Sequence, residues 1–120
     1  MSDPIRNDTA SNGAGLTQKR CIPCEVGGPS FNRVEAEALM GQVPEWELDT
    51  DAKTISKNFK FKDFARALAF VNNVGALAES EGHHPGIDFG WGRAKISLTT
   101  HAIKGLSEND FIMAAKIDGF

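Results

Sequence analysis

The chain has 120 residues, 41% of them hydrophobic and 24% charged, with a formal net charge of −3. This is the size and composition of one globular domain with its own core, and the small negative charge argues against the basic surface that nucleic acid requires. No apolar run approaches the roughly 18 residues that span a bilayer, and the first residues do not resemble a secretion signal. We therefore expect a cytoplasmic protein that binds neither nucleic acid nor membranes.

The first 20 residues are mostly Ser, Asn, Gly, Asp and Thr, with little to bury. We expect a flexible leader over residues 1–30 and a single domain over residues 31–120. Cys21 and Cys24 form a Cys-x-x-Cys pair, which is half of a zinc site, a redox couple or two incidental thiols. No second pair completes four ligands, and zinc held with two histidines is disfavoured because adjacent histidines point apart.

A short helix and a hairpin are predicted next. Asn32 and Glu35 make a capping box, after which Val34, Ala38 and Leu39 recur on one helix face. Alternation of apolar and polar residues then predicts one strand around Trp46 and Leu48 and a second over residues 54–61, which together make an antiparallel hairpin.

The longest periodic segment, residues 63–81, predicts the core helix. Its apolar residues share one face: Phe64, Ala67, Leu68, Val71, Val74, Leu77 and Ala78. Gly82 stands where a left-handed residue ends a helix, and Pro85 prevents continuation. His83 and His84 therefore leave the helix end in extended geometry, since the residue before a proline avoids the helical region.

A second hairpin is predicted over residues 87–91 and 94–98, with its turn at Gly92-Arg93. Because the hairpin folds back, His101 beyond its second strand should return to the start of its first strand and face the histidine pair across a gap of ligand size. All three histidines of the chain would then lie together. Imidazoles titrate near neutral pH, so the cluster is a candidate acid–base site, whereas each histidine alone also fits a solvated turn.

A last helix begins after Ser107 as N-cap, with Asp110 at its third position. The element order α-β-β-α-β-β-α predicts an α+β fold, a four-stranded antiparallel sheet with helices on one face. Such a sheet leaves edge strands exposed, and pairing with a second copy covers them. We therefore expect a homodimer or homotetramer.

Seven residues of this region form one spaced pattern: Glu79, His83, His84, Pro85, Trp91, His101 and Asp110. The pattern resembles that of the pterin-4a-carbinolamine dehydratases, a family that also includes a dimerisation cofactor of a homeodomain transcription factor. The likeness covers roughly residues 31–118, including a similar stretch at 105–110, and the Cys-x-x-Cys leader is similar to that of some bacterial members. So many matched positions are far more specific than a short loop motif.

The resemblance implies a 4a-hydroxytetrahydropterin dehydratase, a hydro-lyase that forms quinonoid dihydropterin in pterin recycling and needs no metal or other cofactor. Loss of the 4a-hydroxyl requires a proton delivered to the departing oxygen and one taken from the ring nitrogen, and imidazoles suit both steps. By resemblance, His83 and His101 carry the acid and base roles and His84 helps to hold the pterin, with the division among the three left open. The alternative is a non-catalytic module on the same scaffold that binds a protein partner or acts as a transcriptional cofactor.

The other residues of the pattern also have structural explanations. Asp110 caps the last helix and can in addition orient His101. Glu79 lies in the last turn of the core helix, where an acid is unfavourable, so a local partner is expected. Trp91 is either a pterin-stacking ring or a core-facing aromatic, and we expect the core. Pro85 shapes the backbone.

Overall fold

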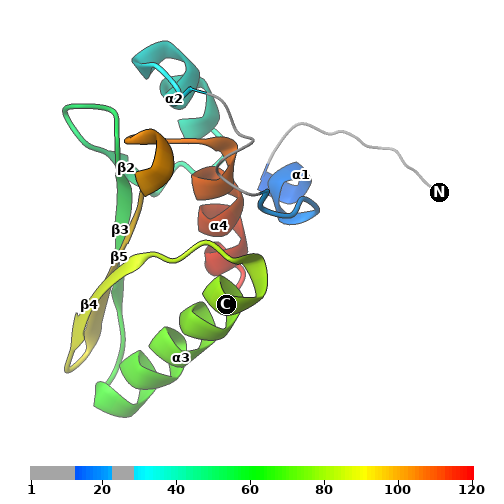
Figure 1. Ribbon diagram of the computed structural model, residues 1–120. Helices are drawn as coiled ribbons and strands as arrows, with labels where there is room; N and C mark the ends of the chain where they lie inside the picture. Colours follow the sequence, from blue (N-terminus) through cyan, green and yellow to red (C-terminus); the bar gives the residue numbers. More distant parts are fainter. Residues whose placement is uncertain (1–12, 23–28) are drawn as a thin grey trace.

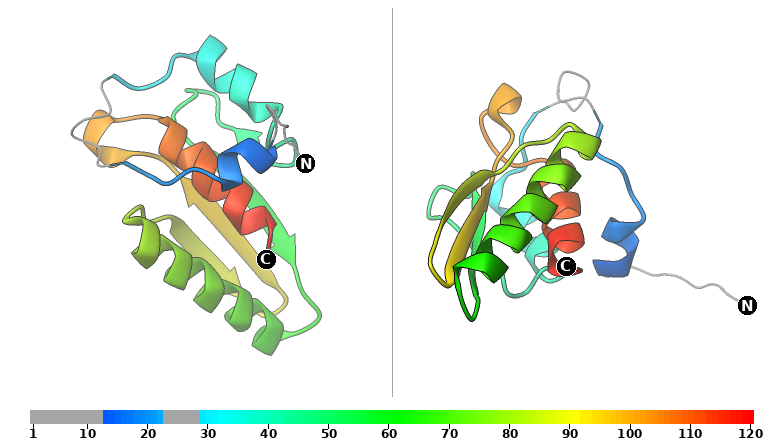
Figure 2. Two further views of the ribbon diagram at one scale, coloured as in Figure 1. Left: turned by 90° about the vertical axis from the view of Figure 1, so that its right-hand side faces the viewer. Right: turned by 90° about the horizontal axis from the view of Figure 1, so that it is seen from below.

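A four-stranded antiparallel sheet forms one layer of the computed structural model, which describes residues 13–22 and 29–120 (Figure 1). Its strand order is β2-β3-β5-β4. The strands are β2 (Glu47–Leu48), β3 (Ile55–Lys60), β4 (Gly86–Gly90) and β5 (Arg93–Leu98). Helices α3 (Phe64–Glu81) and α4 (Glu108–Asp118) cover one face of the sheet (Figures 1 and 2). The predicted α+β fold with a four-stranded antiparallel sheet is confirmed.

Helix α3 begins and ends where the capping residues predict. The Asp63 side chain accepts a hydrogen bond from the backbone N–H of Arg66 at 2.9 Å, and Gly82 ends the helix with φ 67°. Phe64 and Leu68, which the periodicity places on the buried face, are exposed, whereas Phe70 is buried. The line of buried residues on α3 is thus rotated from the predicted face: Ala67, Phe70, Val74 and Ala78.

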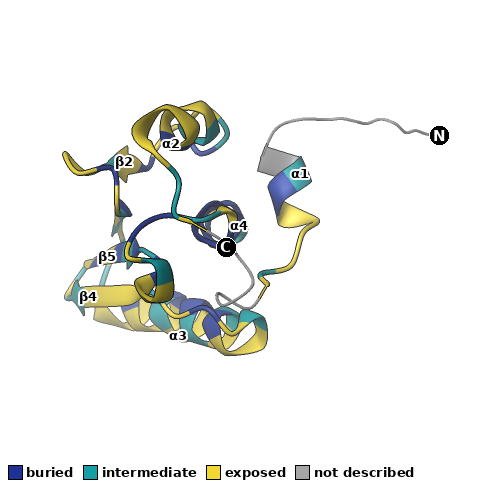
Figure 3. Ribbon diagram, turned by 45° about the horizontal axis from the view of Figure 1, so that its top comes forward, coloured by how far each residue is buried: buried dark blue, intermediate teal, exposed yellow. Residues whose placement is uncertain are grey.

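Helix α4 is the most deeply buried element (Figure 3). One side faces β5, and the short helix α1 (Gly13–Thr17) packs on another. Leu16 of α1 belongs to the hydrophobic core. The structure therefore differs from the expected flexible leader for residues 13–22, because a single buried leucine and the polar contacts described below tie this segment to the domain. The rest of the predicted leader before Pro29 lies outside the described residues.

Helix α2 (Arg33–Met40) has the predicted capping box, in which Asn32 and Glu35 exchange two hydrogen bonds of 2.8 Å. Its buried residue is Ala36, whereas Val34, one of the residues predicted to share an apolar face, is exposed. In the described ranges, no helix is long and apolar enough to cross a membrane.

The hairpin of β4 and β5 turns one residue earlier than predicted. Gly90 pairs with Arg93, so the two turn residues are Trp91 and Gly92, and Gly92 supplies the positive φ of 74°. Trp91 therefore lies on the turn and is 72% exposed. The prediction that Trp91 faces the core is wrong, because the strand ends before the alternation reaches this residue.

Candidate functional site

The end of α3 sends two consecutive histidines into different environments. The N–H groups of Gly82 and His83 both bond to the carbonyl of Ala78, which closes the helix through the left-handed glycine. His83 then turns inward and is 6% exposed, whereas His84 is exposed on the surface. The glycine cap and the proline that follows thus direct the His83 ring into the core and the His84 ring to the surface.

His83 binds a buried carboxylate from α4. Its Nε2 atom lies 2.6 Å from Oδ1 of Asp110, which is fully buried. The other oxygen, Oδ2, accepts hydrogen bonds from the hydroxyl of Thr100 at 2.8 Å and from the backbone N–H of Ser107 at 3.0 Å. The Thr100 and Ser107 hydroxyls are in turn 2.9 Å apart. Asp110 is therefore a buried acceptor whose donors come from three separate segments.

This arrangement orients the imidazole of His83. An ionised carboxylate can only accept hydrogen bonds. In this pair, Nε2 of His83 therefore carries the hydrogen and donates a hydrogen bond to Oδ1 of Asp110. Nδ1 is then the nitrogen that accepts a proton from another group. A carboxylate that holds a histidine in one tautomer and one orientation is a common feature of acid–base sites.

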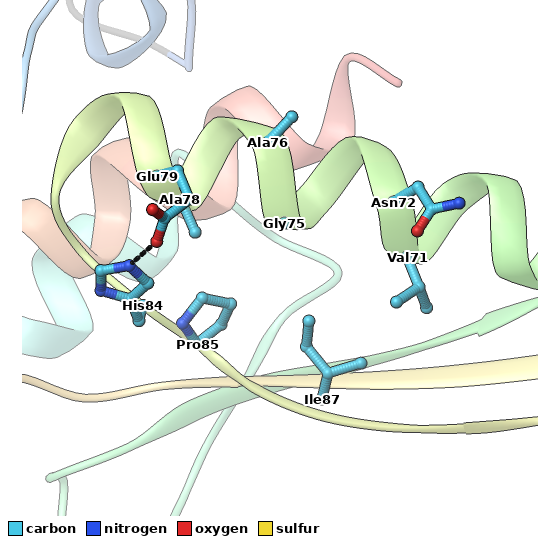
Figure 4. Close-up of a pocket in the computed structure, with 9 residues that line it drawn as sticks. All are labelled: Val71, Asn72, Gly75, Ala76, Ala78, Glu79, His84, Pro85 and Ile87. Carbon is cyan, nitrogen blue, oxygen red and sulfur yellow. Dashed lines mark hydrogen bonds and ion pairs between the residues drawn. The ribbon is translucent and has the colours of Figure 1, made fainter.

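His84 is held by a different carboxylate at the surface. Its Nε2 atom lies 2.5 Å from Oε2 of Glu79, one turn back on α3, and both side chains are largely exposed (Figure 4). The local partner expected for Glu79 is thus present. Because both groups are solvated, this pair contributes little to stability and mainly sets the direction of the imidazole.

An open groove of about 500 Å³ runs between α3 and the start of β4, beside this pair (Figure 4). Its lining is mostly apolar, with His84 and Glu79 as the charged or titratable groups at one end. The lining residues are Val71, Asn72, Gly75, Ala76, Ala78, Glu79, His84, Pro85 and Ile87. The volume lies in the range of sites for small organic molecules.

His101 lies in the short helix η2 (His101–Ile103), directly after Thr100. Since Gly86 pairs with Ser97, the segment after β5 leaves the sheet at the same end as the segment before β4, as predicted. The His101 ring is exposed, however, and within the described part of the chain it makes no hydrogen bond or ion pair. The suggestion that Asp110 orients His101 is wrong, because the Asp110 oxygens are taken by His83, Thr100 and Ser107.

The structure separates Trp91 from this group. The five residues of β4 separate Pro85 from Trp91, and the six steps between the two residues span roughly 20 Å. Pro85 lines the groove, whereas the tryptophan lies at the far end of the hairpin. Trp91 therefore lies away from the groove and from the His84–Glu79 pair.

Thr100 is the site residue that sequence reasoning missed. It is buried and bonds to both Asp110 and Ser107, and its one signal in the sequence is that it precedes His101. Cys24, the second thiol of the Cys-x-x-Cys pair, lies outside the described residues. Within residues 13–22 and 29–120, no three His, Cys, Asp or Glu side chains gather to hold a metal ion.

Comparisons with known proteins identify relatives of this chain. The family model described as pterin 4 alpha carbinolamine dehydratase matches residues 29–120. A protein of Halorhodospira halophila, provisionally named a pterin-4-alpha-carbinolamine dehydratase, is 53% identical over 103 residues, which cover 86% of this chain and 94% of that protein. A protein of Methylococcus capsulatus with the same provisional name is 50% identical and is covered to 90%.

Two solved structures are also similar. A transcriptional coactivator/pterin dehydratase from Brucella melitensis has a TM-score of 0.71 at 29% identity, covering 75% of this chain and 96% of that one. A pterin dehydratase-like RuBisCO assembly factor of the alpha-carboxysome has a TM-score of 0.55 at 29% identity, covering 62% of this chain and 87% of that one. The sheet and its two helices thus have the α+β fold of the pterin dehydratases. The chain belongs to the pterin-4a-carbinolamine dehydratase family.

Proposed function

We propose that the protein is a 4a-hydroxytetrahydropterin dehydratase, a hydro-lyase that forms quinonoid dihydropterin. One observation carries the proposal beyond family membership. His83, whose orientation is set by the buried Asp110, lies directly before two residues that line an open groove, His84 and Pro85. An imidazole held in one orientation, in the residue that precedes this groove lining along the chain, suits proton transfer on a bicyclic ligand.

The proposed reaction moves two protons and breaks one carbon–oxygen bond. A base takes the proton from the ring nitrogen next to C4a, its electron pair forms the C=N bond, and the C4a–O bond breaks. An acid delivers a proton to the departing hydroxyl, which leaves as water. The acid has then lost one proton and the base has gained one, so proton exchange with solvent restores both groups.

The setting of each histidine supports a division of these roles. His83 has its Nε2–H fixed on Asp110, so its Nδ1 can act as the base or, after protonation, as the acid. His101 is exposed and free to exchange protons with water, which suits the partner role. His84, held by Glu79 at the groove, is proposed to bind the pterin.

The test is dehydration of a 4a-hydroxytetrahydropterin, followed by ultraviolet absorbance in wild type and in the variants His83→Ala, His84→Ala and His101→Ala. Loss of either acid–base residue should reduce the rate by about 10² to 10⁴. Lys104→Ala is the matched control, because Lys104 is an exposed cation of the same loop as His101. If His83→Ala and His101→Ala both react at the wild-type rate, the assignment of roles is refuted.

A second candidate function is a protein-binding module whose pocket is not used for catalysis. It is supported by the structural likeness to a RuBisCO assembly factor and by Trp91, an exposed aromatic far from the histidines. The same absorbance assay separates the two. A wild-type protein that does not accelerate dehydration over buffer would favour the binding module.

We also propose a homo-oligomer, paired through β4. This strand is an edge of the sheet, and the exposed side chain of Phe64 on neighbouring α3, which packs on Phe89 of β4 and does not line the groove, leaves apolar surface beside it. Pairing of two such edges would bury that surface. A Phe64→Lys variant should lower the mass measured by light scattering to that of a smaller species, and an unchanged mass would place any interface elsewhere.

A further inference from the structure

Residues 19–22, which we call the strap, cross the ends of the two helices that carry His83 and Asp110. On the α3 side, the backbone N–H of Cys21 donates to Oε1 of Glu81 at 2.9 Å. The Arg20 side chain donates to the carbonyl of Ser80 at 3.4 Å. The strap therefore holds the last turn of α3, two residues before His83.

On the α4 side, the strap is held by a paired contact. The carboxamide of Asn109 accepts from the backbone N–H of Ile22 at 3.0 Å and donates to the carbonyl of the same residue at 2.7 Å. Asn109 is buried, and both polar atoms of its side chain are satisfied by the strap. A Lys19–Glu108 ion pair of 2.5 Å adds an outer contact. The strap thus holds the residue directly before Asp110.

The contact with Glu81 involves a buried charge. The Glu81 side chain is 4% exposed and lies 2.5 Å from Nζ of Lys116 on α4. The hydrogen bond from Lys116 lowers the pKa of Glu81 against the opposing effect of burial, and the Cys21 N–H lowers it further. A carboxylate at a helix C-terminus is otherwise unfavourable, so this side chain needs both donors to remain where it is.

We propose that the strap, through Glu81 and Asn109, holds the two helix ends in the positions at which His83 meets its carboxylate. Glu81 and Asn109 are then positioning residues of the acid–base site, although neither reaches the groove. The strap bonds to residues on both sides of the 2.6 Å contact between His83, which follows α3, and Asp110 of α4.

The kinetic consequence rests on the proposed dehydratase function, whereas the positional consequence does not. Small displacements of a catalytic group reduce rate much more than they reduce folding stability, and a misplacement of about 1 Å can cost 10² in rate. Release of the strap should therefore lower kcat about tenfold to a hundredfold, with KM little changed, because the residues that line the groove are not touched.

The test uses a substitution that removes one backbone donor. The Ile22 side chain is 54% exposed, so Ile22→Pro chiefly removes the N–H that binds Asn109, and Ile22→Ala is the control that keeps this N–H. Asn109→Ala is the second variant and removes both bonds. The first readout is the downfield proton NMR signal of the imidazole N–H bonded to Asp110, which is assigned by its loss in His83→Gln. The second readout is kcat.

We expect Ile22→Pro and Asn109→Ala to broaden or lose the His83 proton signal and to lower kcat, and Ile22→Ala to retain both. A retained signal and rate in Ile22→Pro overturn the proposal. Unfolding of Ile22→Pro under conditions in which Ile22→Ala is folded also overturns it, because the strap would then serve stability alone. If the wild type lacks dehydratase activity, the proposed function fails, but the proton signals still decide whether the strap positions His83.

Discussion

Replacing Asp110 by Asn tests the central pair of the site with almost no change in shape. The amide keeps one oxygen in place of two. With that oxygen at the Oδ2 position, it still accepts from Thr100 and from the backbone N–H of Ser107. The amide nitrogen then faces Nε2 of His83 as a donor, so the imidazole must give up its proton there and carry it on Nδ1 instead.

The size of the effect follows from these three bonds. Two of them survive as weaker neutral hydrogen bonds and one is reversed, so we expect a loss of about 1–3 kcal/mol in the free energy of unfolding. A domain with a stability of about 5–15 kcal/mol remains folded after such a loss. The proton on Nδ1, however, occupies the nitrogen proposed to act as base, so dehydration should slow by about 10² to 10⁴.

Three measurements separate the effects of Asp110→Asn: urea denaturation for stability, ¹⁵N NMR for the tautomer of His83, and ultraviolet absorbance for dehydration. Asp88→Asn is the control, because the Asp88 carboxylate is exposed and pairs with Arg93 at 3.3 Å. That surface pair should contribute on the order of 0–1 kcal/mol and nothing to the rate. An Asp110→Asn protein that keeps the Nε2–H tautomer and the wild-type rate would refute the reasoning.

Three further predictions concern the strap and the end of α3. Burial, followed by the Glu81 charge, raises the pKa of Cys21 to about 12. In a variant whose other cysteine is changed to serine, alkylation of Cys21 near neutral pH should therefore be at least about tenfold slower than alkylation of a free cysteine. An equal rate would contradict this prediction. Because the pKa of Glu81 is lowered from 4.5, its stabilisation is present above that value and lost as pH falls below it. Glu81→Gln should therefore flatten the fall of Tm in acid, whereas an unchanged slope would assign that fall to other groups. Gly82 has φ 67°, and apart from its two neighbours in the chain no heavy atom lies within 4 Å of the position that a Cβ would occupy, so Gly82→Ala should cost about 1 kcal/mol through backbone strain alone. Gly75→Ala, in the interior of α3, should instead stabilise slightly, and equal effects of the two substitutions would rule out the left-handed cap as the cause.

Local rules were sufficient for the order of the four strands and of helices α2, α3 and α4, and for the ends of α3. Asp63 and Gly82 bound the helix because a side-chain acceptor and a left-handed residue satisfy groups within one turn of the chain. The position of the His83-His84 pair follows from the same cap together with Pro85. The strand pattern likewise predicts the antiparallel sheet, since alternation of apolar residues reports which face of each strand is buried.

Tertiary packing decided which groups in the site meet. His83 and Asp110 are 27 residues apart, and nothing local distinguishes His83 from His101 as the partner of that carboxylate. The burial of Leu16 and the contacts of the strap are likewise not predictable from local sequence, because their partners lie on helices far along the chain. Spacing along the chain reports the geometry of one turn or one pleat, whereas the pairing of side chains from different elements depends on how whole helices pack against the sheet.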